Sequence, residues 1–254
     1  MTRPAALSSV SSSRLIRFLT ENELIGVAAQ VEDVGHRLGD WLNFRQAIAL
    51  HKLLADAPAP MTPSGRRAPL MRAEDLRTHV YKVRAALEQS IVQGAAPGSG
   101  LSRIDLPLAE LDEPIDPQTA FEPCRRYLNA HQRQMEAVIS TLRQQVRGQV
   151  SKLPALQALA ALDAQFESIL NDRETLWLGK LIPLLEKRFH QALKQHLKNQ
   201  TEAQAQATPL QAPHASAWLA PIRQLLQKAL LAELDTRLQP TMGLLEAFTS
   251  ENAP

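Results

Sequence analysis

Cysteine is almost absent from this chain, and aromatic residues are scarce. Cys124 is the only cysteine among 254 residues, which excludes an internal disulfide and any zinc or iron–sulfur site built from several cysteines of one chain. Aromatic residues make up only 4% of the sequence, whereas β-sheets draw on aromatic and β-branched side chains. We therefore expect a helical protein that is kept in the reducing environment of the cytoplasm.

Long apolar runs and a strong net charge are also missing. No uninterrupted apolar stretch approaches the ~20 residues that a membrane-spanning helix needs. Glu21, Glu23, Glu32 and Asp33 interrupt the region where the core of a signal peptide would lie. The formal net charge is +2, so the chain as a whole does not look like a polyanion binder. We expect no membrane span, and any basic patch must be local.

The strongest pattern present is a helical repeat of apolar residues over about residues 121–200. Met135, Ile139, Leu142 and Val146 follow each other at steps of three and four, which is the apolar stripe of a helix that packs on another helix. A stretch of about eighty residues with this pattern predicts two long helices folded into a hairpin.

Prolines divide this region. Pro154 suits the first turn of a helix and disfavours helical geometry in the residue before it, so a reversal is expected near Ser151–Pro154. We predict an all-α protein, an elongated helical bundle built on a long antiparallel helical hairpin of about residues 121–200. Pro183 predicts a bend near Gly179–Lys180 in the second arm.

Segments rich in proline, glycine or Ala/Gln suggest the remaining boundaries, within one structural domain. A second helix is expected from near Asp33 to Ala55, and Pro240 is expected to bend or end the last helix. The predicted segments are N-terminal helices (1–56), a Pro-rich loop (57–71), a single helix (72–94), an acidic Pro/Gly-rich segment (95–117), the long helical hairpin (118–200), an Ala/Gln loop (201–213) and a C-terminal helix (214–254).

No catalytic, cofactor-binding or metal-binding constellation is evident. The seven histidines show neither the H-E-x-x-H nor the E-x-x-H spacing of helical metal sites, and no phosphate loop or dinucleotide fingerprint occurs. Cys124 lies near the start of a helix, where the dipole could lower its pKa, although a lone cysteine in a bundle is more often a packing residue. Trp41, Trp177 and Trp218 lie in apolar stripes and are expected in the core. We expect no enzyme.

The most suggestive local feature is a row of cations that we call the basic strip: Lys187, Arg188, His190, Lys194 and Lys198. It borders an apolar stripe on the same expected helix. Such a strip can meet nucleic acid, an acidic partner helix or an anionic membrane surface, but a solvated helix face is the commoner outcome. The full candidate interaction surface adds Arg143 and Arg147 from the facing arm, with Trp218 and Leu225 from the C-terminal helix.

Five segments in succession resemble the proteobacterial family known as domain of unknown function 3348. They are Asp40–Ile48, Lys82–Leu87, Arg126–Glu136, Leu184–Phe189 and Leu230–Pro240, and together the match covers nearly the whole chain. The resemblance implies no catalytic or binding residue. It implies a genomic setting, because relatives are commonly encoded beside proteins that look like MotA/TolQ-type proton-channel subunits and OmpA/MotB-like peptidoglycan binders.

The sequence favours two kinds of function over an enzyme, which would need a buried polar cluster assembled from distant helices. The first is a non-enzymatic helical interaction or scaffold protein, accessory to an envelope complex of the MotA/TolQ-like and OmpA/MotB-like kind. The alternative is a nucleic-acid-associated helical protein that uses the basic strip with Arg143 and Arg147. Self-association stays open in both, because apolar stripes of this length can exceed what one chain covers.

Overall fold

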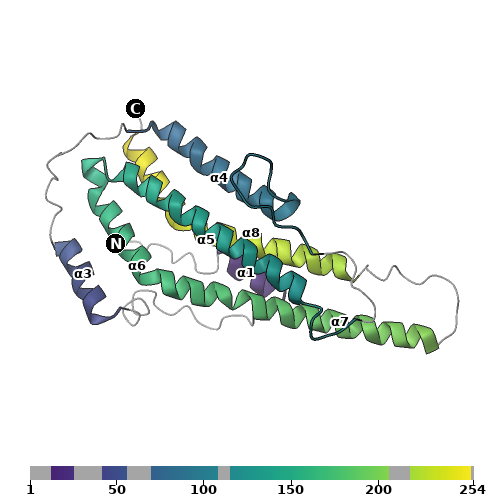
Figure 1. The fold of residues 1–254 in the computed structure, drawn as a ribbon. Coiled ribbons are helices and arrows are strands. Elements are labelled where there is room, and N and C mark those ends of the chain that lie inside the picture. Colours follow the sequence, from purple (N-terminus) through teal and green to yellow (C-terminus); the bar gives the residue numbers. More distant parts are fainter. Residues whose placement is uncertain (1–12, 26–41, 56–69, 108–114, 206–217, 253–254) are drawn as a thin grey trace, which may run out of the picture. The chain divides into compact units, whose positions relative to one another are not determined.

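The computed structural model describes residues 13–25, 42–55, 70–107, 115–205 and 218–252. Within these ranges the regular secondary structure is entirely helical, which confirms the predicted all-α fold class. The elements are α1 (Arg14–Glu21), α3 (Phe44–Ala55), α4 (Ala73–Gln93), α5 (Glu122–Val150), the 3-10 turn η2 (Pro154–Leu156), α6 (Gln157–Gly179), α7 (Leu181–Ala205) and α8 (Leu219–Glu251) (Figure 1).

These elements form two compact units. The first unit comprises Met1–Val27, Ala86–Met135 and Leu178–Thr236, and the second comprises Ala28–Ala85, Glu136–Trp177 and Arg237–Pro254. The boundaries fall inside α4, α5, α6 and α8, so these helices contribute residues to both units. Each unit has its own buried core, and the prediction of one structural domain stays a prediction.

The core of the first unit is made of apolar stripes from α5, α7 and α8. Leu128 of α5, Phe189 of α7 and Leu226 of α8 are each 0% exposed. The ring of Phe121, just before α5, lies 5.3 Å from the ring of Phe189, within the range of a favourable aromatic pair. Helices with little aromatic content thus pack around a few aromatic rings and many leucines.

Some polar groups inside the first unit form hydrogen bonds from one helix to another. Nε2 of Gln132 donates a hydrogen bond of 2.9 Å to Glu233, whose residue surface is 0% exposed. The hydroxyl of Tyr127 donates to the carbonyl of Ile91 at 2.8 Å. Ile91 lies in the last turn of α4, where carbonyls lack helical partners, so this bond both satisfies the helix end and positions α4 against α5.

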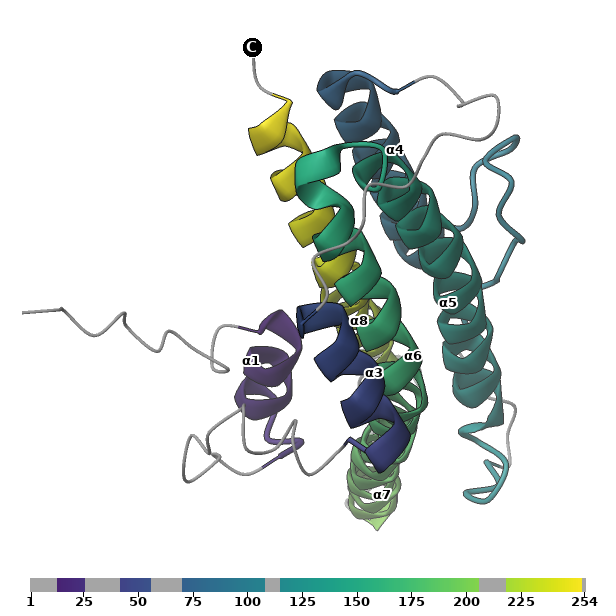
Figure 2. The same cartoon turned by 90° about the vertical axis from the view of Figure 1, so that its left-hand side faces the viewer.

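The core of the second unit draws one stripe from each of four helices. Val80 of α4, Val146 of α5 and Phe248 of α8 are 0% exposed, and Ile169 of α6 is 4% exposed. In this unit α4 lies beside α5 (Figure 2), where Nε2 of His79 lies 3.0 Å from Oε1 of Gln145. The apolar spacing read from the sequence therefore corresponds to buried positions.

The single continuous hairpin of residues 121–200 stays a prediction, because its parts belong to different units. Within each unit α5 does contact the helices that follow it. In the second unit Arg143 of α5 pairs with Asp163 of α6, and in the first unit Nε2 of Gln132 donates to the carbonyl of Leu178 at 3.3 Å.

The predicted second arm is two helices rather than one bent helix. α6 ends at Gly179 and α7 begins at Leu181, so the interruption falls where the bend was predicted. Pro183 lies in the first turn of α7, where its missing N–H has no helical acceptor to lose. The proline therefore marks a helix start.

The prediction that the second helix includes residues 42 and 43 is wrong, because neither residue is helical. α3 begins at Phe44, because Asn43 and Gln46 form a reciprocal cap in which each side-chain oxygen accepts the backbone N–H of the other, at 2.9 and 3.0 Å. The expected beginning near Asp33 lies outside the described residues, as do Trp41 and residues 56–69 and 206–217.

Two further boundaries differ from expectation. α7 continues to Ala205, so the prediction placed the start of the Ala/Gln loop, at residue 201, too early. Alanine, glutamine and glutamate are good helix formers, and Nζ of Lys198 lies 3.7 Å from Glu202 one turn later.

Pro240 does not end α8, which runs to Glu251. The buried residues beyond it, Leu244, Leu245 and Phe248, offset the lost helical hydrogen bond.

Trp177 is not a core residue, contrary to expectation. It is 49% exposed, and Leu176 is 61% exposed, whereas Leu178 is only 6% exposed. Consecutive residues of a helix point about 100° apart, so three apolar residues in a row cannot share one buried stripe. Leu178 takes the buried position. None of the described helices is long and apolar enough to cross a membrane.

We predict that Phe189→Ala lowers the free energy of unfolding by about 4 kcal/mol, because it empties the centre of the first unit's core. Urea denaturation followed by circular dichroism measures this loss. Gln191→Ala, two residues later on the exposed side of α7, is the matched control and should change stability by less than about 0.5 kcal/mol. Equal losses in the two variants would contradict the core assignment.

Candidate functional site

The basic strip lies on the outer side of α7 in the first unit. Lys187, Arg188, Lys194 and Lys198 are exposed, and His190 is half-buried. The apolar residues that alternate with them, Leu185, Phe189 and Leu193, are at most 2% exposed. One face of α7 is therefore used by the core, and the face left to solvent is cationic.

Three of these cations have no acidic partner among the described residues. Nε2 of His190 lies 3.8 Å from Glu186, and Lys198 is close to Glu202. Among the residues the structure describes, no carboxylate lies within ion-pair distance of Lys187, Arg188 or Lys194. The nearest acid along the helix, Glu186, is already bonded to Nη2 of Arg125 at 2.5 Å. Within the described part of the chain, these three positive charges are therefore exposed without a compensating acid.

Of the two C-terminal residues predicted for the surface, Trp218 is half-buried and Leu225 is buried. The ring of Trp218 stacks on His196, with ring centroids 5.2 Å apart and planes at 19°, and it lies 5.5 Å from Phe189. Leu225 is 8% exposed. The prediction that Leu225 lies on an interaction surface is wrong, because it belongs to the stripe that α8 buries in the first unit.

Arg143 and Arg147 belong to the second unit and are held by acids of α6. Nη2 of Arg143 lies 2.6 Å from Asp163, and Nη1 of Arg147 lies 2.9 Å from Asp163 and 2.6 Å from Glu167. Burial alone lowers the pKa of the Arg147 guanidinium, but the bonds to Glu167 and Asp163 outweigh it and leave that pKa raised. These arginines are neutralised within the unit and do not supply free positive charge.

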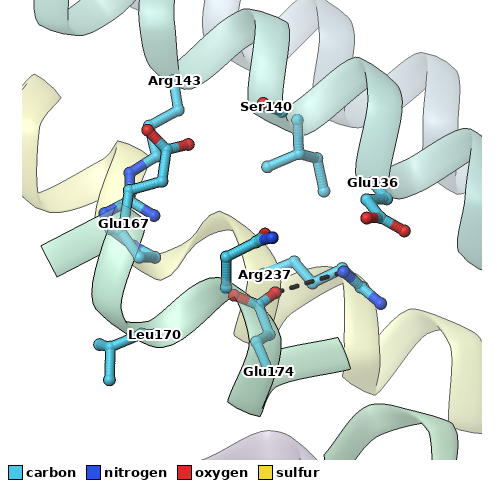
Figure 3. Close-up of a pocket in the computed structure, with 10 residues that line it drawn as sticks. Glu136, Ser140, Arg143, Glu167, Leu170, Glu174 and Arg237 are labelled. Atoms are coloured by element: carbon cyan, nitrogen blue, oxygen red, sulfur yellow. Dashed lines mark hydrogen bonds and ion pairs between the residues drawn. The ribbon is translucent and has the colours of Figure 1, made fainter. Parts of the chain in front are cut away.

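A pocket of about 100 Å³ lies next to this ion-pair network, also within the second unit (Figure 3). Its walls come from α5, α6 and α8. The lining residues are Glu136, Ile139, Ser140, Arg143, Glu167, Leu170, Asn171, Glu174, Arg237 and Pro240. Sequence reasoning missed this pocket, although polar residues recur at helical spacing on the contributing faces of both α5 and α6.

Charges in the pocket wall are mostly paired. Nη1 of Arg237 lies 3.3 Å from Glu174, as the dashed line in Figure 3 marks. Glu167 is bonded to Arg147. Glu136 is exposed, and no cation lies within ion-pair distance of it among the described residues. Anywhere in the described ranges, no group of three or more His, Cys, Asp or Glu side chains is arranged to hold a metal ion.

Cys124 is a buried packing residue of the first unit. It is 5% exposed, and burial raises the pKa of its thiol to about 11, with the charge of Arg223 acting in the opposite direction. The packing role favoured from the sequence agrees with this burial, because desolvation of the thiolate outweighs the opposing effect of Arg223. At neutral pH Cys124 is a protonated thiol.

His131 is the other buried titratable group of interest. It is 1% exposed, and its ring meets that of Tyr127 edge-on at 4.6 Å. Within the described residues its Nε2 has no hydrogen-bond partner. Burial lowers the pKa of the imidazole to about 4, so the side chain is neutral at physiological pH.

Comparison with known proteins gives one match. The family model described as "Protein of unknown function (DUF3348)" matches residues 1–250. No curated protein and no solved structure matches the chain. The family description names no activity, so a proposal about function has to rest on the surfaces described above.

We predict that Asp163→Ala destabilises the chain by about 3 kcal/mol, because it leaves the guanidiniums of Arg143 and Arg147 poorly compensated at a largely buried site. Denaturant unfolding is the measurement. Asp172→Ala, an exposed acid on the same helix, is the control. A loss no larger than that of the control would show that the network contributes nothing to stability.

A second prediction concerns acid stability and His131. An unfolded histidine takes up a proton below its ordinary pKa of 6.5, whereas the folded one does so only near pH 4. Its contribution to stability is therefore complete above pH 6.5 and is lost as the pH falls toward 4. We expect this loss to be about 3 kcal/mol.

Unfolding free energies measured between pH 7 and pH 4 test this expectation. His131→Leu should lose less stability over that interval than the unmodified chain, because no imidazole remains to be protonated. His51→Leu, at an exposed position on α3, should leave the pH dependence unchanged. Parallel pH profiles for the unmodified chain and His131→Leu would refute the assignment.

Proposed function

The chain belongs to the DUF3348 family of proteins of unknown function, and we propose that it is a non-enzymatic helical interaction or scaffold protein whose basic strip docks an acidic protein partner. One observation supports this most: Lys187, Arg188 and Lys194 are exposed without a carboxylate partner among the described residues. Several arginines that reach other helices are paired with an acid, such as Arg14 with Asp235 at 2.5 Å.

The spacing of the strip suits a helical partner. Lys187, Lys194 and Lys198 lie on one face of α7, and they span about 16 Å at 1.5 Å rise per residue. An acidic helix of about three turns can place carboxylates opposite them. Complementary charge of this kind contributes association rate and choice of partner more than raw affinity, which fits a protein that recognises another chain.

The alternative of nucleic-acid binding has weaker support. Its predicted contributions from Arg143 and Arg147 are neutralised by Asp163 and Glu167. Single-stranded nucleic acid is normally held by aromatic stacking as well as by cations, but Phe189 is fully buried and Trp218 is stacked on His196. Three free cations alone give only modest phosphate affinity at physiological salt.

We extend the proposal to a cytoplasmic location and an accessory role beside an envelope complex of the MotA/TolQ-like and OmpA/MotB-like kind. The support is the family resemblance and the genomic setting that it implies. The partner's contribution would be an acidic segment that faces the basic strip. Self-association is the other outcome, in which the partner is a second copy of this chain. Light scattering of the purified chain would then give the mass of a dimer or a larger oligomer.

We predict that the double variant Lys187→Glu/Lys194→Glu reduces capture of the partner from native cells by at least about tenfold, because like charges then face each other across the interface. Lys228→Glu makes the same change at an exposed position of α8 in the same unit, and it should retain full capture. The captured protein is identified by mass spectrometry and its binding repeated with purified components.

Equal capture by the double variant and the control would refute docking through the basic strip. A parallel measurement with fluorescently labelled DNA and RNA at low salt addresses the alternative. Binding that weakens with salt and disappears in Lys194→Glu would favour a nucleic-acid role over the protein partner.

A further inference from the structure

We propose that the pocket of the second unit binds a small organic cation, an aliphatic ammonium compound, with Glu136 as its counter-charge. The pocket encloses about 100 Å³ between α5, α6 and α8. One water molecule occupies about 30 Å³ of liquid, so the space admits an ammonium head and a short chain. This inference does not depend on the basic strip, which belongs to the first unit.

The arginines around the pocket are already compensated by acids. Arg143 is 12% exposed and bonded to Asp163, and Arg237 is 8% exposed and paired with Glu174. Arg147, behind the wall, holds Glu167. Once these pairs are taken as neutral, one lining charge remains without a partner among the described residues: the carboxylate of Glu136.

The surroundings of Glu136 suit an ammonium group. Figure 3 shows the Glu136 side chain projecting from α5 on the same side of the pocket as the Arg237–Glu174 pair. Ser140 lies one turn along α5 and also lines the pocket, and Asn171 lines it from α6. An ammonium carries three donors and no acceptor. The carboxylate, the hydroxyl oxygen and the amide oxygen are acceptors for such donors.

The rest of the lining suits a short hydrocarbon chain. Ile139, Leu170 and Pro240 contribute apolar surface to the same pocket. Pockets that hold small molecules typically combine such apolar walls with a few placed polar groups. A simple anion fits less well, because three carboxylates face it and both guanidiniums in the wall are engaged.

Isothermal titration calorimetry of the full chain with putrescine tests the proposal. We expect a dissociation constant on the order of 1 mM, as for a single charged contact with few apolar ones. The probe 1,4-butanediol has the same carbon chain without charge and should not bind measurably. Succinate, which has the opposite charge, should not bind either.

Variants locate the binding to the pocket. Glu136→Gln should weaken putrescine binding about tenfold, because the counter-charge is lost while the side-chain shape is kept. Asn171→Leu, at an exposed position of the wall, should weaken it by placing a bulky apolar group in the space. Glu246→Gln, at an exposed position of α8 outside the pocket, should bind as the unmodified chain does. Circular dichroism checks that each variant is folded.

Several results would overturn the proposal. They are no heat of binding with putrescine, equal weakening in Glu136→Gln and Glu246→Gln, or binding of succinate in place of the diamine. Binding of butanediol as strong as that of putrescine would show an apolar site without charge selection and would also refute it.

Discussion

Burial of one apolar stripe of α5 is the constraint on which the rest of this structure depends. Leu128, Met135, Val146 and Val150 are 0% exposed and Leu142 is 2% exposed, so the stripe is covered at every turn where it recurs. Burying a leucine or valine side chain contributes about 2 kcal/mol, and this gain, repeated along the stripe, offsets part of the conformational entropy lost when the covering helices are ordered.

The covering helices have little freedom in which face they turn inward. In the first unit α7 buries Leu185, Phe189 and Leu193, and the helical period then directs the cations between them outward. The basic strip is therefore a geometric consequence of core formation, and its exposure does not by itself imply a partner. The three neighbouring cations Lys187, Arg188 and Lys194 have no acidic partner among the described residues, whereas Arg143 and Arg147 of the second unit are held by acids.

Ion pairs and buried amides fix which helices meet, while the apolar stripes supply most of the stability. The contacts of Arg143 and Arg147 with Asp163 contribute little net free energy beyond that of well-packed apolar side chains. They are nonetheless specific, because a shift of α6 by one turn would leave partly buried charges without partners. The bond from Gln132 to Glu233 has the same role in the first unit.

Much of the fold was predictable because helix geometry fixes the spacing of residues on one face, whatever packs against that face. The stripes of α5 and α7, the interruption near Gly179–Lys180 and the absence of strands in the described ranges all follow from residue spacing. The incorrect predictions share one cause, which is that local sequence does not determine which other helix packs against a given face. Leu225 and Trp177 are both apolar residues in helical stripes, yet one is 8% and the other 49% exposed. The pocket needed three helices to be placed together before its residues could be grouped.

The chemistry of the buried groups also bears on what kind of protein this is. Cys124 and His131 are the side chains with the best-known nucleophilic and acid–base roles in the interior of the first unit. A general acid or base works best with a pKa near the operating pH and within reach of its substrate. Burial moves both pKa values away from neutral pH: it raises the pKa of the thiol to about 11 and lowers the pKa of the imidazole to about 4. Their environment suits packing, whereas Lys187, Arg188, Lys194 and Glu136 are exposed and have no ion-pair partner among the described residues. This contrast supports the proposal that the chain acts by recognition.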